Sequence, residues 1–279
     1  MERILGKLSL EELRTILVSP NFAFQVQNEI ENRIIVQETV KRALVKAACT
    51  GDLSAIKALK LDFSTLSDEV INPIVQSGGE KGLTPLHVAA KYGHLETIKF
   101  IVPKLQDKNP IEENGNNYPL NLAAIYGHLD VVEYLHQFVE GHINPPGHMG
   151  RTVLHDAAQN GHLEIVKFYT SKLDNPNPKQ AYRNQYRGHT PLHDAAQWGH
   201  LEVAKHLCGL IQDRNPSDDN GYTPLHSAAQ FGRLHIVKYL VQFIEDKHPK
   251  SGPFWNFATP LDRAIKYDRK SVVDFLTNL

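Results

Sequence analysis

The sequence predicts an all-α solenoid of about seven helix-turn-helix repeats, preceded by a helical N-terminal extension. Three observations support this: a recurring motif, a spacing near 34 residues, and apolar residues at helical intervals. The motif begins at residues 84, 118, 152, 190, 223 and 259, so successive starts lie 34, 34, 38, 33 and 36 residues apart. A period of this length is typical of stacked repeats, each of which buries its apolar face only against its neighbours.

The motif reads Thr-Pro-Leu-His-x-Ala-Ala-x-x-Gly-His and is intact at residues 84–94 and 190–200. Its threonine can cap the helix that follows, and its proline is tolerated in the first turn because the N–H it lacks would be unpaired there. We expect the leucine to point into the stack and the two alanines to keep the helix thin enough for close packing. The glycine is expected to end this first helix.

A second, amphipathic helix is expected after each glycine, as at Leu95, Ile98 and Ile101. An Asn-Pro pair follows it in four repeats and a His-Pro pair in the fifth, beginning at residues 109, 144, 177, 215 and 248. Proline cannot continue a helix and biases the preceding residue towards extended geometry. Each pair is therefore predicted to mark the exit from the second helix.

The first and last repeats are atypical, as expected of caps on a solenoid. The first keeps its leucine at Leu44 but lacks Thr-Pro and His, and the 42 residues to Leu86 require an enlarged loop within residues 60–81. The last replaces the motif histidine by Asp262. We predict an extension at residues 1–43 and repeats near 44–81, 82–114, 115–149, 150–187, 188–220, 221–256 and 257–279.

The motif, its period and its six in-phase copies resemble the ankyrin repeat. This resemblance implies a binding surface made of the first helices and the projecting loop tips, with a concave face towards the partner. We therefore expect a protein–protein interaction scaffold, adaptor or inhibitor, and no enzyme. A purely structural spacer is an alternative.

The extension suggests an alternative. Ser9 and Glu12 match a capping box that opens one helix, and Val26, Ile30 and Ile34 at steps of four suggest another. The segment is loosely similar to the helical segment that follows BTB domains in ubiquitin-ligase adaptors, which implies a substrate-recruiting subunit that uses residues 1–43. The simpler interpretation is a helical cap.

Composition narrows the classes of partner. Lys and Arg number 30 against 31 Asp and Glu, so no global field favours nucleic acid or an anionic membrane. The N-terminus resembles neither a signal peptide nor a membrane span. Cys49 and Cys208 lie four repeats apart, roughly 40 Å if stacked helices are ~10 Å apart, which is too far for a disulfide. We expect a protein that is monomeric alone, in a reducing intracellular compartment, cytoplasmic or nuclear.

Histidine is abundant, with 15 residues, but its placement argues against a metal-binding or catalytic role. The histidines recur one per repeat, so successive members are expected ~10 Å apart, whereas zinc needs ligands within ~2–2.3 Å of one centre. Neither a recurring nucleophile nor a phosphate-binding loop accompanies them. We expect no metal, no cofactor and no catalytic residues, and a role for the histidines in bridging backbone groups.

A column of aromatic residues just before the helix-ending glycine is the first candidate for partner contact, because aromatics are favoured interface anchors. It comprises Tyr92, Tyr126, Trp198, Phe231 and Tyr267, interrupted by Asn160. Alternatively, these side chains pack on the loop of the next repeat. We expect Trp198 to be the central contact, with Asp156 and Asp194 beside it.

Two longer loops add candidates. Residues 177–188 form a loop with the basic and aromatic tip Tyr182, Arg183 and Tyr186, which we expect to contact the partner. The aromatic run at residues 253–257 is expected to cover the last repeat instead.

The family resemblance also implies hydroxylation of an asparagine that exits the second helix. Asn215 matches the preferred pattern best, with Leu207 eight residues and Asp213 two residues before it. Asn109 is the second candidate. The alternative is that these asparagines only shape their turns.

Overall fold

The computed structural model describes residues 11–13, 23–61, 63, 66–75, 80–113, 117–139, 150–180 and 187–279, with backbone only at 23–25. The chain divides into two compact parts. The N-terminal part comprises Met1–Ala89 and His94–Asp107, and the C-terminal part comprises Ala90–Gly93 and Lys108–Leu279. The secondary structure assigned within these described ranges is helical, without β-strands.

The N-terminal part is organised around a single long helix. Its elements are α3 (Ala23–Thr50), α4 (Ser54–Ala58), α5 (Asp68–Ile71), the first five residues of α6 (Pro85–Tyr92), α7 (Leu95–Ile101) and η2 (Val102–Lys104). The last three residues of α6 are counted with the C-terminal part. The predicted boundary at residue 43 falls inside α3, which packs on α4 and α5. No glycine or proline interrupts residues 23–50, so the helix continues until Gly51, at φ 74°, allows the chain to turn.

The enlarged loop expected within residues 60–81 contains the short helix α5. Asn72, just after α5, accepts a hydrogen bond through its side-chain oxygen from the backbone N–H of Leu86, at 2.9 Å. This contact satisfies an otherwise orphaned donor in the first turn of α6. The pair Asn72-Pro73 is therefore an additional Asn-Pro exit that the sequence analysis did not recognise.

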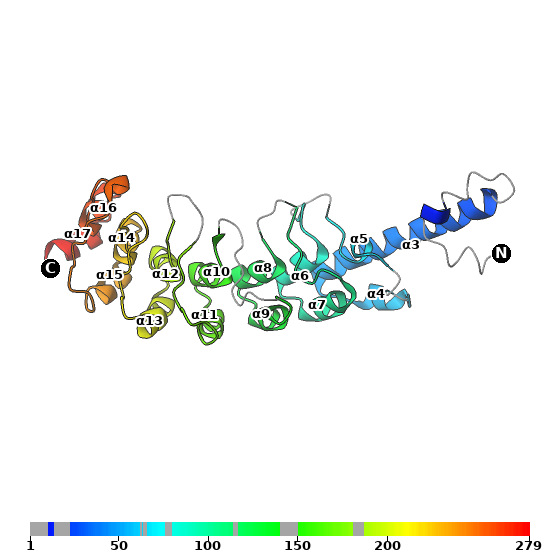
Figure 1. Ribbon diagram of the computed structural model, residues 1–279, viewed down its shortest axis with the longest axis horizontal. Coiled ribbons are helices and arrows are strands. Elements are labelled where there is room, and N and C mark those ends of the chain that lie inside the picture. Colours follow the sequence, from blue (N-terminus) through cyan, green and yellow to red (C-terminus); the bar gives the residue numbers. More distant parts are fainter. Residues whose placement is uncertain are drawn as a thin grey trace. The chain divides into compact units, whose positions relative to one another are not determined.

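The C-terminal part is a two-row stack of helix pairs (Figure 1). Its elements are α8 (Pro119–Tyr126), α9 (Leu129–His136), α10 (Val153–Asn160), α11 (Leu163–Thr170), α12 (Pro191–Trp198), α13 (Leu201–Leu210), α14 (Pro224–Gln230), α15 (Leu234–Leu240), η4 (Pro253–Trp255), α16 (Pro260–Lys266) and α17 (Lys270–Thr277). The first helices α8, α10, α12, α14 and α16 pack side by side, and α9, α11, α13, α15 and α17 form the second row.

The core follows the motif. The motif leucines Leu120, Leu154, Leu192 and Leu225 are fully buried, as are the alanine pairs behind them. Each first helix is thin on the side that faces its neighbour, so the next helix can approach closely and exclude water. The leucine and alanine positions predicted to form the stack are confirmed.

The motif histidines join each repeat to the next. The ring Nδ1 of His155 lies 2.8 Å from the Thr152 hydroxyl and accepts from the Thr152 backbone N–H, while Nε2 lies 3.1 Å from the carbonyl oxygen of His189. His193 and His226 repeat the arrangement towards the carbonyls of Tyr222 and Ala258. The expected bridging role is confirmed.

Burial keeps these rings neutral. Desolvation lowers the pKa of His155 and of His226 to about 4, and lowers that of His193 well below 6.5. A neutral ring can accept at one nitrogen and donate at the other, as each of these contacts requires. In the last repeat Asp262 takes the place of the motif histidine at the cap, accepting from the backbone N–H and hydroxyl of Thr259.

A second series of side chains bridges the repeats at the other end of the first helix. The Nε2 atoms of His128, His162 and His200 lie 2.8–2.9 Å from carbonyl oxygens of the preceding repeat. Arg233 and Arg269 take over this role, donating through Nε at 3.0 and 2.9 Å. The sequence analysis missed both arginines, although Arg233 follows Gly232 where other repeats have histidine.

Candidate functional site

The aromatic column lies at the exposed end of the first helices. Tyr92, Tyr126 and Trp198 are the last residues of α6, α8 and α12, and 45%, 49% and 49% of their surfaces are exposed. Tyr267, just after α16, is 39% exposed, and Phe231 after α14 is half-buried. All five belong to the C-terminal part. Because Tyr92, Tyr126, Trp198 and Tyr267 are all at least 39% exposed, most of the column is accessible to a partner.

The bridging side chains fix the register of this column. The residue directly before each aromatic residue offers its backbone carbonyl to the next repeat: Lys91 to His128, and Gln197 to Arg233. Because the aromatic residue is bonded to a backbone held in this way, its position relative to the next repeat is set. The result is a series of aromatic side chains on a backbone with fixed spacing, an arrangement that would lose little conformational freedom on binding.

Two lysines add positive charge to the ends of the column. The ammonium group of Lys91 lies 5.4 Å from the ring centroid of Tyr92 and 5.6 Å from that of Tyr126. Lys266 lies 5.7 Å from the ring of Tyr267. Asn160 interrupts the column and donates to the carbonyl of Asp156 instead.

The structure gives Asp156 and Asp194 an internal role. They are 8% and 3% exposed, and Arg151 forms ion pairs of 3.2 and 3.1 Å with them. Asn121 donates a further hydrogen bond of 2.8 Å to Asp156. Their carboxylates thus tie three successive repeats together, and their predicted contact with a partner stays a prediction. Sequence reasoning missed Arg151, which stands directly before the motif threonine.

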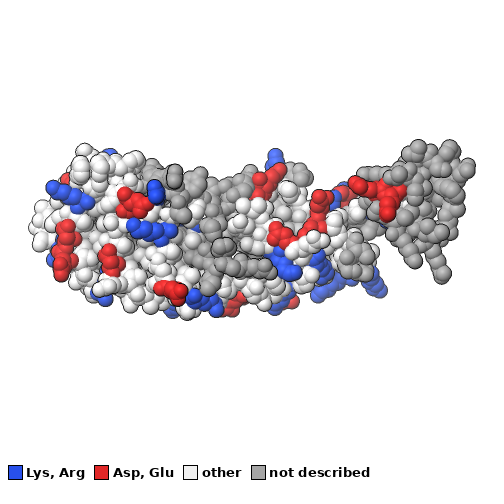
Figure 2. All heavy atoms as spheres, in the orientation of Figure 1, with Lys and Arg blue, Asp and Glu red and all other residues white. Residues whose placement is uncertain are grey.

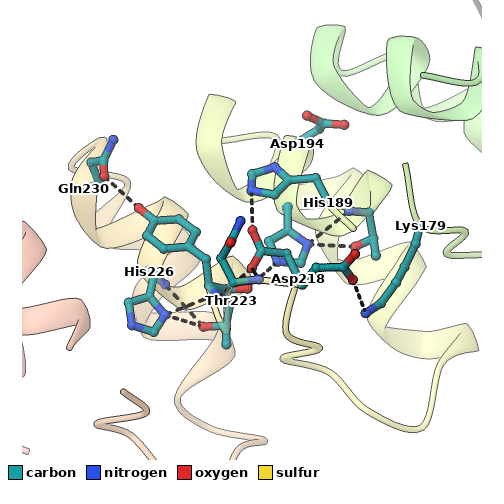
Figure 3. Close-up of polar contacts among 12 residues, drawn as sticks. Lys179, His189, Asp194, Asp218, Thr223, His226 and Gln230 are labelled. Atoms are coloured by element: carbon teal, nitrogen blue, oxygen red, sulfur yellow. Dashed lines mark hydrogen bonds and ion pairs between the residues drawn. The ribbon is translucent and has the colours of Figure 1, made fainter. Parts of the chain in front are cut away.

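A buried histidine–aspartate pair lies one repeat further on (Figure 3). His189 Nε2 is 3.4 Å from Asp218 Oδ2, and the other oxygen of Asp218 accepts from the backbone N–H groups of Asn220 and Tyr222, each at 2.8 Å. The His189 ring stacks on that of His193, with centroids 4.6 Å apart. The carboxylate is thus used to shape the loop before α14, which is a structural task.

The aromatic run before the last repeat is covered only in part. Trp255 packs against Tyr222, with ring centroids 5.4 Å apart, as expected of a covering side chain. Phe254 and Phe257, however, are 61% and 58% exposed. The expectation that all three aromatics cover the last repeat is therefore wrong for these two, whose side chains stay largely exposed.

Two of the predicted asparagine exits, Asn177 and Asn215, are confirmed as turn residues. The side-chain oxygens of Asn177 and Asn215 accept hydrogen bonds of 3.0 Å from the backbone N–H groups of Leu192 and Leu225. Each asparagine thereby satisfies an orphaned donor in the first turn of the next first helix. The hydroxylation of Asn215 or Asn109 stays a prediction.

Some predicted features lie outside the described residues. They are Ser9 of the predicted capping box, the loop tip Tyr182, Arg183 and Tyr186, and the exit at Asn144. Within the described ranges, no group of three His, Cys, Asp or Glu side chains is placed to hold a metal ion. Cys49 is an exposed thiol, and burial raises the pKa of the buried Cys208 thiol to about 12.

Surface and helix properties bear on the type of partner. Figure 2 shows Lys and Arg interspersed with Asp and Glu on the described residues of one face, without a large area of one sign. No helix among the described residues combines the length and apolarity needed to span a bilayer.

The comparison with known families agrees with the geometry. The family model for ankyrin repeats, in three copies, matches residues 21–112, 44–144, 104–180, 137–215, 154–252 and 209–279. No curated protein matches the chain. Ankyrin repeats generally mediate protein–protein interaction and are typically non-enzymatic. Since the matches together extend from residue 21 to residue 279, the chain belongs to the ankyrin-repeat family.

Proposed function

We propose that this protein is a scaffold, adaptor or inhibitor that binds a protein partner through the aromatic column of its C-terminal part. The observation that carries this proposal is the exposure of Tyr92, Tyr126 and Trp198 at 45–49% on a backbone tied to the next repeat. Large aromatic side chains that stay exposed on a rigid support are costly to keep in water and are enriched at interfaces.

Trp198 is proposed as the central anchor. Its neighbours in the column are Asn160 on one side and the half-buried Phe231 on the other, so it is the most prominent apolar side chain there. Truncating a true interface anchor costs about 2 kcal/mol or more of binding free energy, which is about 30-fold in affinity.

The test compares affinity capture by the intact protein with capture by Trp198→Ala, using quantitative mass spectrometry of proteins from its native cells. A direct partner should be depleted in the variant, and its dissociation constant should rise by about 30-fold when measured with purified components. Circular dichroism should show an unchanged fold, because the side chain is half exposed.

Phe243→Ala is the matched control. Phe243 is 45% exposed, close to the value for Trp198, but it lies in the turn after the second-row helix α15. Its loss should leave partner capture unchanged. Equal depletion by both variants would show that general surface hydrophobicity, and not the column, drives the binding.

A second candidate function concerns α3. Ile34, Ile35 and Val36 are 39%, 63% and 40% exposed on this helix, which is more apolar surface than a simple cap requires. This favours a second contact, such as recruitment to a ubiquitin ligase through residues 1–43. Co-purification of ligase subunits that is lost in an Ile35→Lys variant of the full chain would support it.

A further inference from the structure

Three successive repeats carry an uninterrupted part of the aromatic column: Trp198, Phe231 and Tyr267, here called the three-ring series. Trp198 ends α12, and the other two directly follow α14 and α16. These three helices pack side by side. Arg233 and Arg269 donate to the backbone carbonyls directly before Trp198 and Phe231, at 3.0 and 2.9 Å. The interval between the rings is therefore set by the stacking of the repeats.

This interval follows from helix packing. Helices packed side by side have axes about 8–10 Å apart. An earlier pair of the column gives a limit from the side chains themselves. The ammonium group of Lys91 lies 5.4 and 5.6 Å from the ring centroids of Tyr92 and Tyr126, so these two centroids are at most about 11 Å apart. A ligand that contacts every ring of the three-ring series must present a side chain on the same side about every 10 Å.

Few backbone conformations repeat at this interval. A polyproline II (PPII) helix has three residues per turn and rises about 3.1 Å per residue, so every third side chain returns to one side after about 9.3 Å. A β-strand returns to one side after about 6.6–6.8 Å. An α-helix returns after seven residues, or about 10.5 Å. The interval fits a PPII helix or an α-helix and does not fit a strand.

Glutamine amides beside the rings favour the PPII helix. Gln197 and Gln230 stand directly before Trp198 and Phe231, and both are half-buried. The hydroxyl of Tyr222 donates to Oε1 of Gln230 at 2.7 Å, so the NH₂ end of this amide is left to donate to a ligand. A PPII backbone makes no internal hydrogen bonds and offers its carbonyls to such donors. An α-helix already uses its carbonyls within itself.

Proline is the residue that suits both the backbone and the rings. Its own ring fixes φ near −65°, which holds a chain in the PPII conformation, so the segment loses little conformational entropy when it binds. Its apolar ring can pack on an aromatic ring, and proline-rich segments dock on aromatic-lined surfaces in this way. Trp198 and Tyr267, at 49% and 39% exposed, offer such ring surface at the two ends of the three-ring series.

We propose that the three-ring series binds a proline-rich segment of the protein partner in the PPII conformation. A proline at every third position lies on Trp198, Phe231 and Tyr267 in turn, and Gln197 and Gln230 donate to carbonyls between the prolines. The inference rests on the proposed function, because it names the class of ligand that the same aromatic column recognises.

The test is a titration with acetyl-Pro-Ala-Gln-Pro-Ala-Gln-Pro-amide, followed through the indole signals in ¹⁵N–¹H spectra. The chain has two tryptophans, so Trp255→Phe assigns both signals. The Trp198 signal should shift and saturate. A peptide of the same composition with prolines at alternate positions, acetyl-Pro-Ala-Pro-Gln-Pro-Ala-Gln-amide, should bind about 10-fold more weakly, because its prolines no longer match the rings.

Variants of the rings are measured by calorimetry, since Trp198→Ala removes the reporter signal. Trp198→Ala and Tyr267→Ala should each weaken the three-proline peptide by about 10-fold. A shortened series, acetyl-Pro-Ala-Gln-Pro-Ala-Gln-Ala-amide, lacks one end proline. With this peptide one of the two variants should have no further effect, because the ring it removes has no proline to contact.

Two further variants complete the comparison. Gln197→Met keeps the length of the side chain but loses the donor, and should weaken the three-proline peptide by about 3-fold or more. Phe243→Ala is again the matched control and should bind this peptide like the wild type.

Several results would overturn the inference: an unmoved Trp198 signal at millimolar peptide, equal binding of the peptide with alternate prolines, or full effects of both end variants on the shortened series. Tighter binding of an alanine-based helical peptide with leucine at every seventh position would assign the rings to a helix instead. Capture of the native partner that depends on Trp198, without binding of the three-proline peptide, would remove the PPII ligand and leave the proposed function standing. Failure of both experiments would remove the proposed function as well.

Discussion

Acidification should destabilise the stack through its buried motif histidines. The pKa of His155 and of His226 is lowered by burial from 6.5 to about 4. The folded state therefore binds fewer protons than the unfolded state. The stabilisation is fully present above about pH 6.5 and is lost as the pH falls towards 4.

The size of the effect follows from the two pKa values. A difference of about 2.5 units between the folded and unfolded pKa corresponds to about 3 kcal/mol of unfolding free energy per histidine, lost in full once the pH lies below both pKa values. Between pH 7 and pH 5 each ring should lose about 2 kcal/mol, or about 4 kcal/mol for His155 and His226 together. His193, whose pKa is also lowered, adds a loss of the same sign.

Urea unfolding followed by far-ultraviolet circular dichroism at pH 7 and pH 5 measures this loss. The matched variant is His226→Asn, because Asn121 occupies the equivalent position in an earlier repeat and does not titrate. The pH-dependent loss in the variant should be about 2 kcal/mol smaller than in the wild type. Burial raises the pKa of Asp156 and acts in the opposite direction, but this contribution is common to both proteins.

A variant with the same pH dependence as the wild type would refute the reasoning. It would show that His226 is protonated in the folded state or does not lose its bridge on protonation.

Four further predictions test the stack. Arg151→Met should destabilise the protein by about 3–5 kcal/mol in urea unfolding, because it leaves two buried carboxylates without their counterion. Gly127→Ala should lower the melting temperature more than Gly199→Ala: an added Cβ meets a histidine ring at 2.6 Å in the first case and a flexible arginine Cδ at 3.0 Å in the second. Leu192→Ala should cost about 2–5 kcal/mol and broaden the unfolding transition, since it uncouples neighbouring repeats. If Asn215 is hydroxylated, mass spectrometry of the native protein should find its peptide heavier by one oxygen, about 16 Da. An unmodified peptide at high coverage, with the hydroxylase present, would exclude the modification.

The sequence by itself determined the repeat architecture. Thr-Pro caps the start of a helix, Ala-Ala keeps the helix thin, and Gly ends it in a left-handed conformation. Because each acts within a few residues, their periodic recurrence predicts where each helix begins and ends. The same period predicted that the histidines would bridge backbone groups. It also placed the aromatic column at one end of the first helices, although not how far each ring would be exposed.

Tertiary structure decided which side chains meet between repeats. The pairing of Arg151 with Asp194 joins residues 43 positions apart, and no local sequence pattern predicts this ion pair. The exposure of Trp198 and of Phe257 likewise depends on what the neighbouring repeat places beside each side chain. Local preferences shape a single helix, whereas burial and charge pairing are set by the register of the whole stack.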